Sequence, residues 1–241
     1  MNLIFDIGNT RIKLAVFQEH TIVESLVVSP KKLAKEITRL CKKYPIVNAI
    51  VSSVGEMNFE DLDELSFIKK VLILDHTTEV PFINRYKTPK TMGVDRIALV
   101  SGATNQYPSK DVLIIDAGTC ITYDFVNSKK EYFGGGISPG IKMRYQSLNT
   151  FTANLPQLEM APFSLIGGDT AGSIHSGVLN GILYEIDGLI AEYQYKYPNL
   201  TVLLTGGDTN FLAKKLKSSI FANPNFLLEG LNSILIHNLD E

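Results

Sequence analysis

The sequence predicts an α/β protein built from two tandem domains of related topology. Short runs rich in Ile and Val, bounded by turn residues, are typical of buried strands. Three such runs open the chain, three more open its second half, and helices and further strands follow in both halves. Because the same order of elements occurs twice, a duplicated α/β domain is the economical interpretation. We set the domains at residues 1–110 and 111–241 and expect the active site in a cleft between them.

The first half contains three sequential strands, at 3–7, 12–17 and 21–28, separated by polar turns. A helix follows, with Ser29 as a candidate cap and Pro30 in its first turn. Its apolar face is formed by Leu33, Ile37, Leu40 and Tyr44. We then expect a strand at about 47–52, a short acidic helix near 59–69, a strand at 71–75, and a helix from about 93 to 105 that leads into the second half.

The second half starts again with strands at 111–116, 120–126 and 131–137. A helix is expected near Pro139, a long helix from about Asp169 to Tyr197, a strand at 201–205, and two closing helices. The long helix holds four glycines: Gly172, Gly177, Gly181 and Gly188. Each glycine is unfavourable in a helix by roughly 1 kcal/mol relative to alanine. Close packing would offset this, either against a second subunit or within the chain.

Composition excludes several classes of function. The net charge is −2 and the basic residues form no stripe, which argues against nucleic acid as a partner. The start of the chain has no secretory signal, and no apolar run is long enough to span a membrane. Two distant cysteines and four scattered histidines indicate neither a disulfide framework nor a metal cluster. We therefore expect a cytoplasmic protein.

A candidate phosphate loop follows the first strand, in the segment Asp6-Ile7-Gly8-Asn9-Thr10. Gly8 permits a sharp turn whose backbone N–H groups and hydroxyl can hold a phosphate. Asp6, at the end of the strand, suits Mg²⁺ bound through water, since that ion keeps much of its hydration shell. Lys13 lies on the next strand, within reach of the same phosphates. By itself such a turn is more often a plain hairpin.

The same arrangement recurs at Asp116-Ala117-Gly118-Thr119, again after a strand. A third loop, Thr205-Gly206-Gly207-Asp208, follows a strand and opens a helix, where glycines let a ligand approach the backbone. It is equally well explained as a tight turn capped by Asp208. Two matching Asp-x-Gly turns resemble the paired phosphate hairpins of actin-like ATPases and sugar kinases, which implies two ribonuclease H-like domains.

The combined motifs resemble type III pantothenate kinase over nearly the whole chain. They include Gly93-Val94-Asp95-Arg96, Gly135-Gly136-Ile137-Ser138-Pro139-Gly140 and Gly168-Asp169-Thr170, besides the three loops above. The resemblance implies ATP-dependent phosphorylation of pantothenate to 4'-phosphopantothenate, the first step of coenzyme A biosynthesis. It also implies a homodimer whose substrate pocket lies partly at the subunit interface.

The same resemblance implies roles for individual residues. The ATP-binding residues would be Asp6, Ile7, Gly8, Asn9, Thr10, Arg11, Ile12, Lys13 and Thr119. Asp116 would bind a monovalent cation, K⁺ or NH₄⁺. The pantothenate-binding residues would be Tyr86, Gly93, Val94, Asp95, Arg96 and Thr170, with Asp95 as the catalytic base.

The sequence departs from the family pattern at Asp169, where Asn is common before the Thr, and Asp169 also suits a helix cap. Two alternatives remain at this point. A phosphatase or polyphosphatase on the same fold would need a water-activating carboxylate, and the segment from Gly93 to Arg96 favours an acceptor alcohol instead. A nucleotide-binding transcriptional regulator would not need the intact Asp6, Asp95 and Asp116.

Overall fold

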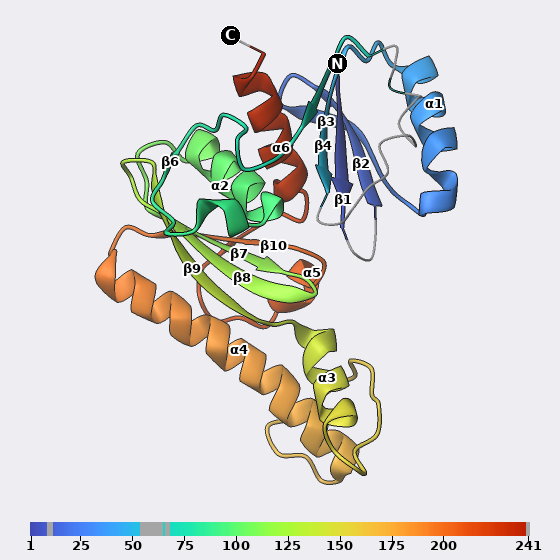
Figure 1. Ribbon diagram of the computed structural model, residues 1–241. Helices are drawn as coiled ribbons and strands as arrows, with labels where there is room; N and C mark the ends of the chain where they lie inside the picture. Colours follow the sequence, from blue (N-terminus) through green and yellow to red (C-terminus); the bar gives the residue numbers. More distant parts are fainter. Residues whose placement is uncertain (9–11, 54–64, 66–67, 240–241) are drawn as a thin grey trace. The chain divides into compact units, whose positions relative to one another are not determined.

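A computed structural model describes residues 1–8, 12–53, 65 and 68–239, which form two compact units (Figure 1). Unit 1 comprises Met1–Pro108, Lys130–Tyr132 and Phe226–Glu241, and unit 2 comprises Ser109–Lys129 and Phe133–Asn225. The C-terminal helix therefore groups with unit 1, although it follows unit 2 in the chain. The domain boundary at 110/111 stays a prediction. The predicted helix near 59–69 and the predicted phosphate contacts Asn9, Thr10 and Arg11 lie largely or wholly outside the described residues.

In the described part of unit 1, a five-stranded sheet has the order β3-β2-β1-β4-β5. Its strands are β1 (Asn2–Ile7), β2 (Ile12–Gln18), β3 (Thr21–Val28), β4 (Asn48–Ser53) and β5 (Lys70–Ile73). The first three strands pair antiparallel, whereas β4 pairs parallel with both β1 and β5. The predicted strands are thus confirmed, and the parallel pairing requires the helical crossover that the sequence places between β3 and β4.

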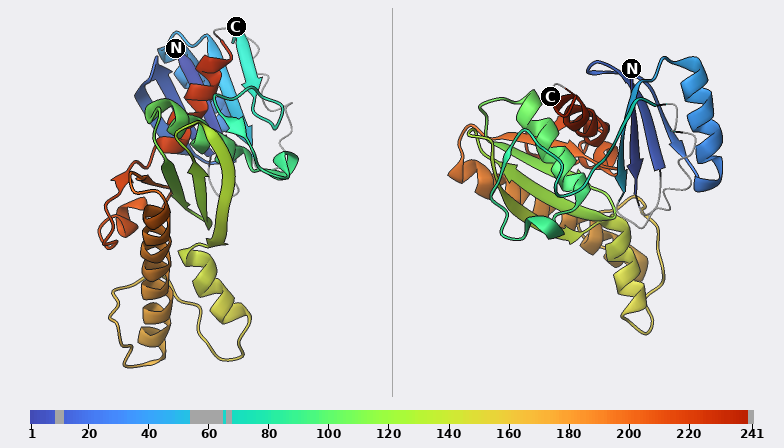
Figure 2. Two further views of the ribbon diagram at one scale, coloured as in Figure 1. Left: turned by 90° about the vertical axis from the view of Figure 1, so that its left-hand side faces the viewer. Right: turned by 45° about the horizontal axis from the view of Figure 1, so that its top comes forward.

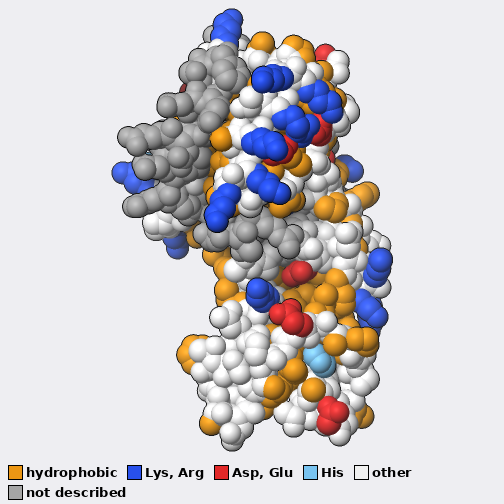
Figure 3. Space-filling view, turned by 90° about the vertical axis from the view of Figure 1, so that its right-hand side faces the viewer, with side chains coloured by type: hydrophobic (Ala, Val, Ile, Leu, Met, Phe, Trp, Pro, Cys, Tyr) orange, Lys and Arg blue, Asp and Glu red, His pale blue; other side chains and the backbone are white. Residues whose placement is uncertain are grey.

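Helices cover both faces of this sheet. The helix α1 (Leu33–Lys43) buries Leu33, Ile37 and Leu40 against one face, as its spacing predicts. Two residues behave differently from expectation: Tyr44 lies just beyond the helix end, and Ser29 makes no capping hydrogen bond before the short 3₁₀ turn η1 (Pro30–Lys32). On the outer side of α1, basic side chains are interspersed with acidic ones (Figure 3), and Glu24 pairs with both Arg39 and Lys43.

The opposite face packs against α6 (Phe226–His237), which lies beside α2 (Val94–Gln106). These two helices approach closely at glycines: a Cβ added to Gly230 would lie 2.1 Å from the Ala98 carbonyl oxygen, and one added to Gly102 would lie 3.0 Å from the Cα of Gly230. The short elements β6 (Ile83–Asn84) and η3 (Pro89–Thr91) precede α2. The helix predicted at 93–105 is confirmed by α2.

Unit 2 repeats the same plan. Its strands are β7 (Val112–Ala117), β8 (Cys120–Val126), β9 (Glu131–Pro139), β10 (Thr201–Thr205) and β11 (Phe221–Ala222), and their order is β11-β10-β7-β8-β9. The first two residues of β9 pair with β6 and group with unit 1. The helices are α3 (Ile141–Thr150), α4 (Thr170–Lys196) and the short α5 (Thr209–Leu212).

The core of unit 2 lies between its sheet and α4. Ile182, Ile186 and Ile190 of this helix are fully buried against inward-facing residues of β7, β8 and β10. Figure 2 shows the long α4 with α3 beside its N-terminal part. Asp169 caps α4 by accepting a hydrogen bond of 2.6 Å from the backbone N–H of Gly172, as the sequence allows. In the described residues, no helix has the length and apolar character needed to cross a membrane.

Candidate active site

Unit 1 brings the first predicted loop together with the predicted catalytic residue. Asp6 is the next-to-last residue of β1 and lies opposite Lys13 on β2, while Asp95 lies in the first turn of α2. Burial raises the pKa of the Asp6 carboxyl from 3.8 to about 6, with Lys13 lowering it and Asp95 raising it further. Two carboxylates and a lysine from distant parts of the sequence therefore influence one another at the end of this sheet. Ile7, Gly8 and Ile12 flank the same turn.

Asp95 is fixed locally by the backbone that surrounds it. Its Oδ1 accepts a hydrogen bond of 2.8 Å from the backbone N–H of Arg96. A Cβ at position 93 would lie 2.4 Å from that oxygen, so only glycine fits there without moving the carboxylate. The absence of a side chain at Gly93 therefore leaves room for the Asp95 carboxylate in this position.

Arg96 and Tyr86 meet beside this helix start. The Arg96 side chain is 5% exposed, and its guanidinium carbon lies 5.5 Å from the centre of the Tyr86 ring. Tyr86 in turn packs at 6.0 Å against the buried Tyr132. The structure therefore brings together the predicted substrate residues of unit 1: Tyr86, Gly93, Val94, Asp95 and Arg96.

In unit 2, two glycine segments converge on the second predicted loop. The backbone N–H of Gly140 donates to the Thr119 carbonyl at 3.0 Å, and that of Asp208 donates to the Ala117 carbonyl at 3.0 Å. A Cβ on Gly140 would lie 2.1 Å from the Gly118 carbonyl oxygen. Gly206 has φ +96°, and its Cβ would lie 2.3 Å from the Ala117 carbonyl oxygen. The turn that carries Asp116 and Thr119 is therefore held by both other glycine motifs. Asp208 makes no side-chain cap on α5.

Sequence reasoning missed an acidic hub that holds one of these segments. Glu185 of α4 accepts hydrogen bonds from Tyr123 (2.8 Å), Ser138 (2.5 Å) and Arg144 (2.5 Å). Burial by itself would raise the pKa of Glu185, but the hydrogen bonds from Ser138 and Arg144 outweigh it and hold the pKa below its usual range. Arg144 also donates from Nε to the Pro139 carbonyl at 2.8 Å. The signal in the sequence that could have indicated this role is an acidic residue, Glu185, next to the buried apolar face of α4.

Comparisons with known proteins show the family to which the chain belongs. Residues 2–192 match the family model of type III pantothenate kinase. The chain is 48% identical over 244 residues to the type III pantothenate kinase of Flavobacterium johnsoniae, covering 100% of this chain and 99% of that protein. It is 50% identical over 240 residues to the protein of the same name from Christiangramia forsetii, with 99% of each covered.

The chain belongs to the type III pantothenate kinase family. Solved structures support the fold: a Campylobacter jejuni protein described as a Baf family transcriptional activator has a TM-score of 0.62 at 21% identity and covers 99% of this chain and 100% of that one. A glucokinase from an Antarctic psychrotroph has a TM-score of 0.52 at 12% identity, with 98% of each chain covered. At these identities the likeness concerns the fold alone. The predicted fold of two actin-like domains and the predicted family are confirmed.

The residues of this chain fit the two cations that the family resemblance implies. Among the described residues, no group of three His, Cys, Asp or Glu side chains forms a ligand cluster. Mg²⁺, however, is commonly held by one or two carboxylates with water and phosphates, so the buried Asp6 fits it. In unit 2 the buried hydroxyl of Thr122 has no hydrogen-bond partner among the described residues. Thr122 is on β8, directly across from Asp116 on β7. An orphaned oxygen beside a carboxylate fits a monovalent cation.

Thr170 is the one predicted substrate residue that belongs to unit 2, and it lies apart from the other predicted site residues of that unit. It is the first residue of α4 and is exposed, and Glu185, which contacts Ser138, lies fifteen residues further along the helix. At 1.5 Å per residue this separation is roughly 22 Å. Within unit 2, Thr170 is therefore remote from the residues around Ser138 that hold the Thr119 turn.

Proposed function

We propose that this chain transfers the γ-phosphoryl group of ATP to the primary hydroxyl of pantothenate, giving ADP and 4'-phosphopantothenate. The supporting observation is the meeting of Asp6, Lys13 and Asp95 in unit 1, in a chain of the pantothenate kinase family. Phosphoryl transfer depends mainly on positioning and on neutralising phosphate charge, and these residue types supply both. We place the reaction in the cytoplasm.

Asp95 is the proposed acceptor of the proton from the attacking hydroxyl. As that oxygen bonds to the γ-phosphorus, the bond to the bridging oxygen of ADP breaks, and the hydroxyl proton passes to the Asp95 carboxylate. A carboxylate is a weak general base, so orientation of the hydroxyl forms a large part of its role. Arg96 and Tyr86, stacked beside it, are proposed to bind the polar groups of pantothenate.

The phosphates of ATP are proposed to contact two turns. Lys13 and the backbone around Gly8 serve in unit 1, and the Thr119 turn, fixed by Gly140, serves in unit 2. The sequence-based assignments of Asn9, Thr10 and Arg11 to this role remain proposals. A Mg²⁺ ion at Asp6 and a K⁺ or NH₄⁺ ion at Asp116 and Thr122 would add positive charge to stabilise the transferring phosphoryl group.

We also propose a homodimer formed through α4. Added Cβ atoms at Gly177, Gly181 and Gly188 would meet nothing within 4 Å, so close packing within the described residues does not account for these glycines. Offsets of 4, 7, 11 and 18 residues place Gly181, Tyr184, Gly188 and Tyr195 on the same helix face as Gly177. Tyr184 is 56% and Tyr195 is 89% exposed. A second α4 packed on this face would bury both rings, and Thr170 of one subunit is then proposed to serve the other.

The test is ADP release from ATP with and without pantothenate, in potassium and then in sodium buffer. We expect release that requires pantothenate and is faster in potassium. The Asp95→Asn variant is expected to lose activity while keeping its melting temperature. The control is Asp111→Asn, since Asp111 precedes β7 at the end of that strand away from Asp116. Equal ADP release without pantothenate would exclude the kinase reaction, and full activity of Asp95→Asn would exclude the proposed base.

A further inference from the structure

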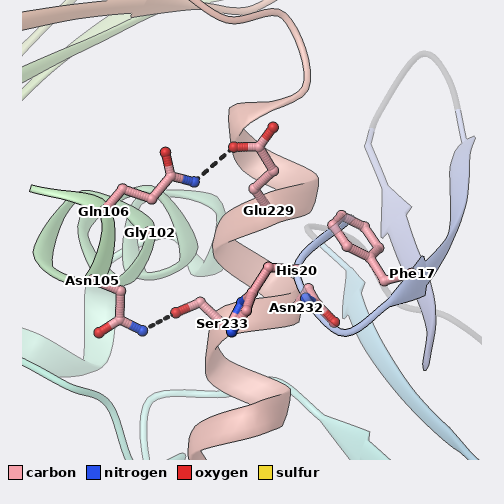
Figure 4. A pocket seen from close by; sticks show the side chains of 8 residues that line it. All are labelled: Phe17, His20, Gly102, Asn105, Gln106, Glu229, Asn232 and Ser233. Atoms are coloured by element: carbon pink, nitrogen blue, oxygen red, sulfur yellow. Dashed lines mark hydrogen bonds between the residues drawn. The ribbon is translucent and has the colours of Figure 1, made fainter. Parts of the chain in front are cut away.

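Asp208 of unit 2 differs from most partly buried acids of the protein because its carboxylate has no partner among the described residues. In the crevice formed by the β2–β3 hairpin, α2 and α6, for comparison, Glu229 accepts a hydrogen bond of 2.7 Å from Gln106 (Figure 4). Asp187 likewise accepts a hydrogen bond of 3.1 Å from the backbone N–H of Ser218. The Asp208 carboxylate accepts no hydrogen bond and forms no ion pair within the described part of the chain. Burial of a carboxylate without such compensation is unfavourable, so its presence here needs an explanation.

Two ordinary explanations for this residue do not hold. Asp208 occupies the N-cap position of α5, but its side chain caps none of the N–H groups of that helix. A neighbouring countercharge does not account for it either, because burial raises the pKa of the Asp208 carboxyl and no charged group among the described residues offsets the shift. The carboxylate is therefore an acceptor left for water or a ligand.

The position of Asp208 in the sheet favours a ligand. Strands β7 and β10 are parallel, with Thr205 directly across from Asp116, so both strands end at the same edge. The backbone N–H of Asp208 donates to the Ala117 carbonyl at 3.0 Å, and Ala117 lies two residues before Thr119. The turn with Asp208 is thus the direct neighbour of the turn that we propose to contact the phosphates of ATP. In α/β proteins, ligands bind at the carboxyl ends of such parallel strands.

The turn before Asp208 also leaves room for a ligand. Gly207 is exposed, and an added Cβ there would meet nothing within 4 Å. The contrast is with Gly206, whose added Cβ would lie 2.3 Å from the Ala117 carbonyl oxygen. Packing within unit 2 therefore requires glycine at 206 but not at 207. A glycine without such a structural reason suits a place where a ligand approaches the backbone closely.

From these observations we infer that Asp208 binds the ribose hydroxyls of ATP, an inference that rests on the proposed function. An ionised carboxylate only accepts hydrogen bonds, so its partner must be a donor. The phosphates of ATP are anionic acceptors and would be repelled, which leaves the 2'- and 3'-hydroxyls and the adenine amino group. The ribose adjoins the phosphates in ATP, as Asp208 adjoins the Thr119 turn. The two oxygens of one carboxylate can accept from two neighbouring hydroxyls.

The experiment is calorimetric titration of the full-length protein with ADP, 2'-deoxy-ADP and inosine diphosphate, which lacks the amino group. We expect the wild type to bind 2'-deoxy-ADP about tenfold more weakly than ADP, as the loss of a hydrogen bond to a charged group predicts. Asp208→Ala should weaken the binding of ADP and of inosine diphosphate about tenfold or more, and that of 2'-deoxy-ADP by a clearly smaller factor. Asp208→Asn keeps one acceptor oxygen and should weaken ADP binding less than Asp208→Ala does.

Controls separate this role from others. Glu159→Gln removes one charge from an exposed loop of unit 2 and should bind all three nucleotides like the wild type. Asp208→Ala should keep the wild-type melting temperature, because it removes no hydrogen bond of the described structure. The titrations are repeated in EDTA, where the effect of Asp208→Ala should persist, since hydroxyls and not Mg²⁺ are the proposed partners.

Several results would overturn the inference. Equal weakening of ADP and 2'-deoxy-ADP would exclude the ribose contact, an effect on ADP but not on inosine diphosphate would assign Asp208 to the amino group, and an effect that vanishes in EDTA would make it a metal ligand. Because the titration needs no pantothenate, ADP binding through Asp208 without phosphorylation of pantothenate would contradict the proposed reaction alone. A wild type that does not bind ADP would overturn both.

Discussion

Replacing Asp6 by asparagine is expected to stabilise the ligand-free protein while abolishing its kinase activity. The carboxyl is largely buried and its pKa is raised from 3.8 to about 6, first by burial and further by the nearby Asp95. In this case the folded state binds the proton more tightly than the unfolded state does. The contribution of the protonated Asp6 carboxyl to the free energy of unfolding is therefore fully present below pH 3.8 and is lost as the pH rises through about 6. The difference corresponds to about 3 kcal/mol at ~1.4 kcal/mol per pH unit.

The assay is urea unfolding of wild type and Asp6→Asn between pH 4 and pH 8, without nucleotide. We expect the two proteins to have nearly equal stability at pH 4 and the variant to be more stable by about 2–3 kcal/mol above pH 7. Asp75→Asn is the control of opposite sign, because hydrogen bonds from Thr77 lower the pKa of Asp75 and its removal should decrease stability at neutral pH. A stability difference for Asp6→Asn that does not change with pH would refute this reasoning.

Three further predictions concern unit 2. Glu185→Gln should raise the KM for ATP about threefold or more while changing kcat less, because weaker hydrogen bonds to Ser138 and Arg144 loosen the segment that holds the Thr119 turn. Glu159→Gln is the control. An unchanged KM in Glu185→Gln would show that the hydrogen bonds of Glu185 have a structural role only. Gly206→Ala should destabilise the protein by about 1–3 kcal/mol in urea unfolding, because φ at Gly206 is +96° and an added Cβ would clash with Ala117. Gly207→Ala is the control and should have little effect, since nothing lies within 4 Å of an added Cβ there. Equal destabilisation by both variants would contradict this reasoning. Gly181→Arg should convert the proposed dimer to a monomer in light scattering, while Gln194→Arg, about 140° around α4 from Gly181, should not; two dimeric variants would place the interface elsewhere.

Much of the fold could be predicted because its signals are local. The strands at 3–7, 12–17 and 21–28, and the long helix from Asp169, follow from apolar periodicity and capping. The return of α6 to unit 1 could not be predicted, because it depends on close contacts such as that of Gly230 with Ala98, which leave no periodic pattern.

The candidate site shows the same division. Asp6, Asp95 and Asp116 could be selected because each lies in a short motif beside a strand end or a helix start. The roles of Arg144 and Glu185 could not, since these residues are 41 positions apart and meet only when α3 packs beside α4. Ser29 illustrates the reverse case: its residue type suits a cap, yet the 3₁₀ turn that follows leaves its side chain without that hydrogen bond.

The central claim is tested most directly by identifying the phosphorylated product. The purified protein would be incubated with ATP, Mg²⁺, K⁺ and pantothenate, and the products analysed by mass spectrometry, with Asp95→Asn in parallel. We predict 4'-phosphopantothenate in an amount equal to the ADP released by the wild type, and none from the variant. ADP formed with inorganic phosphate and without a phosphorylated pantothenate would contradict the proposed function.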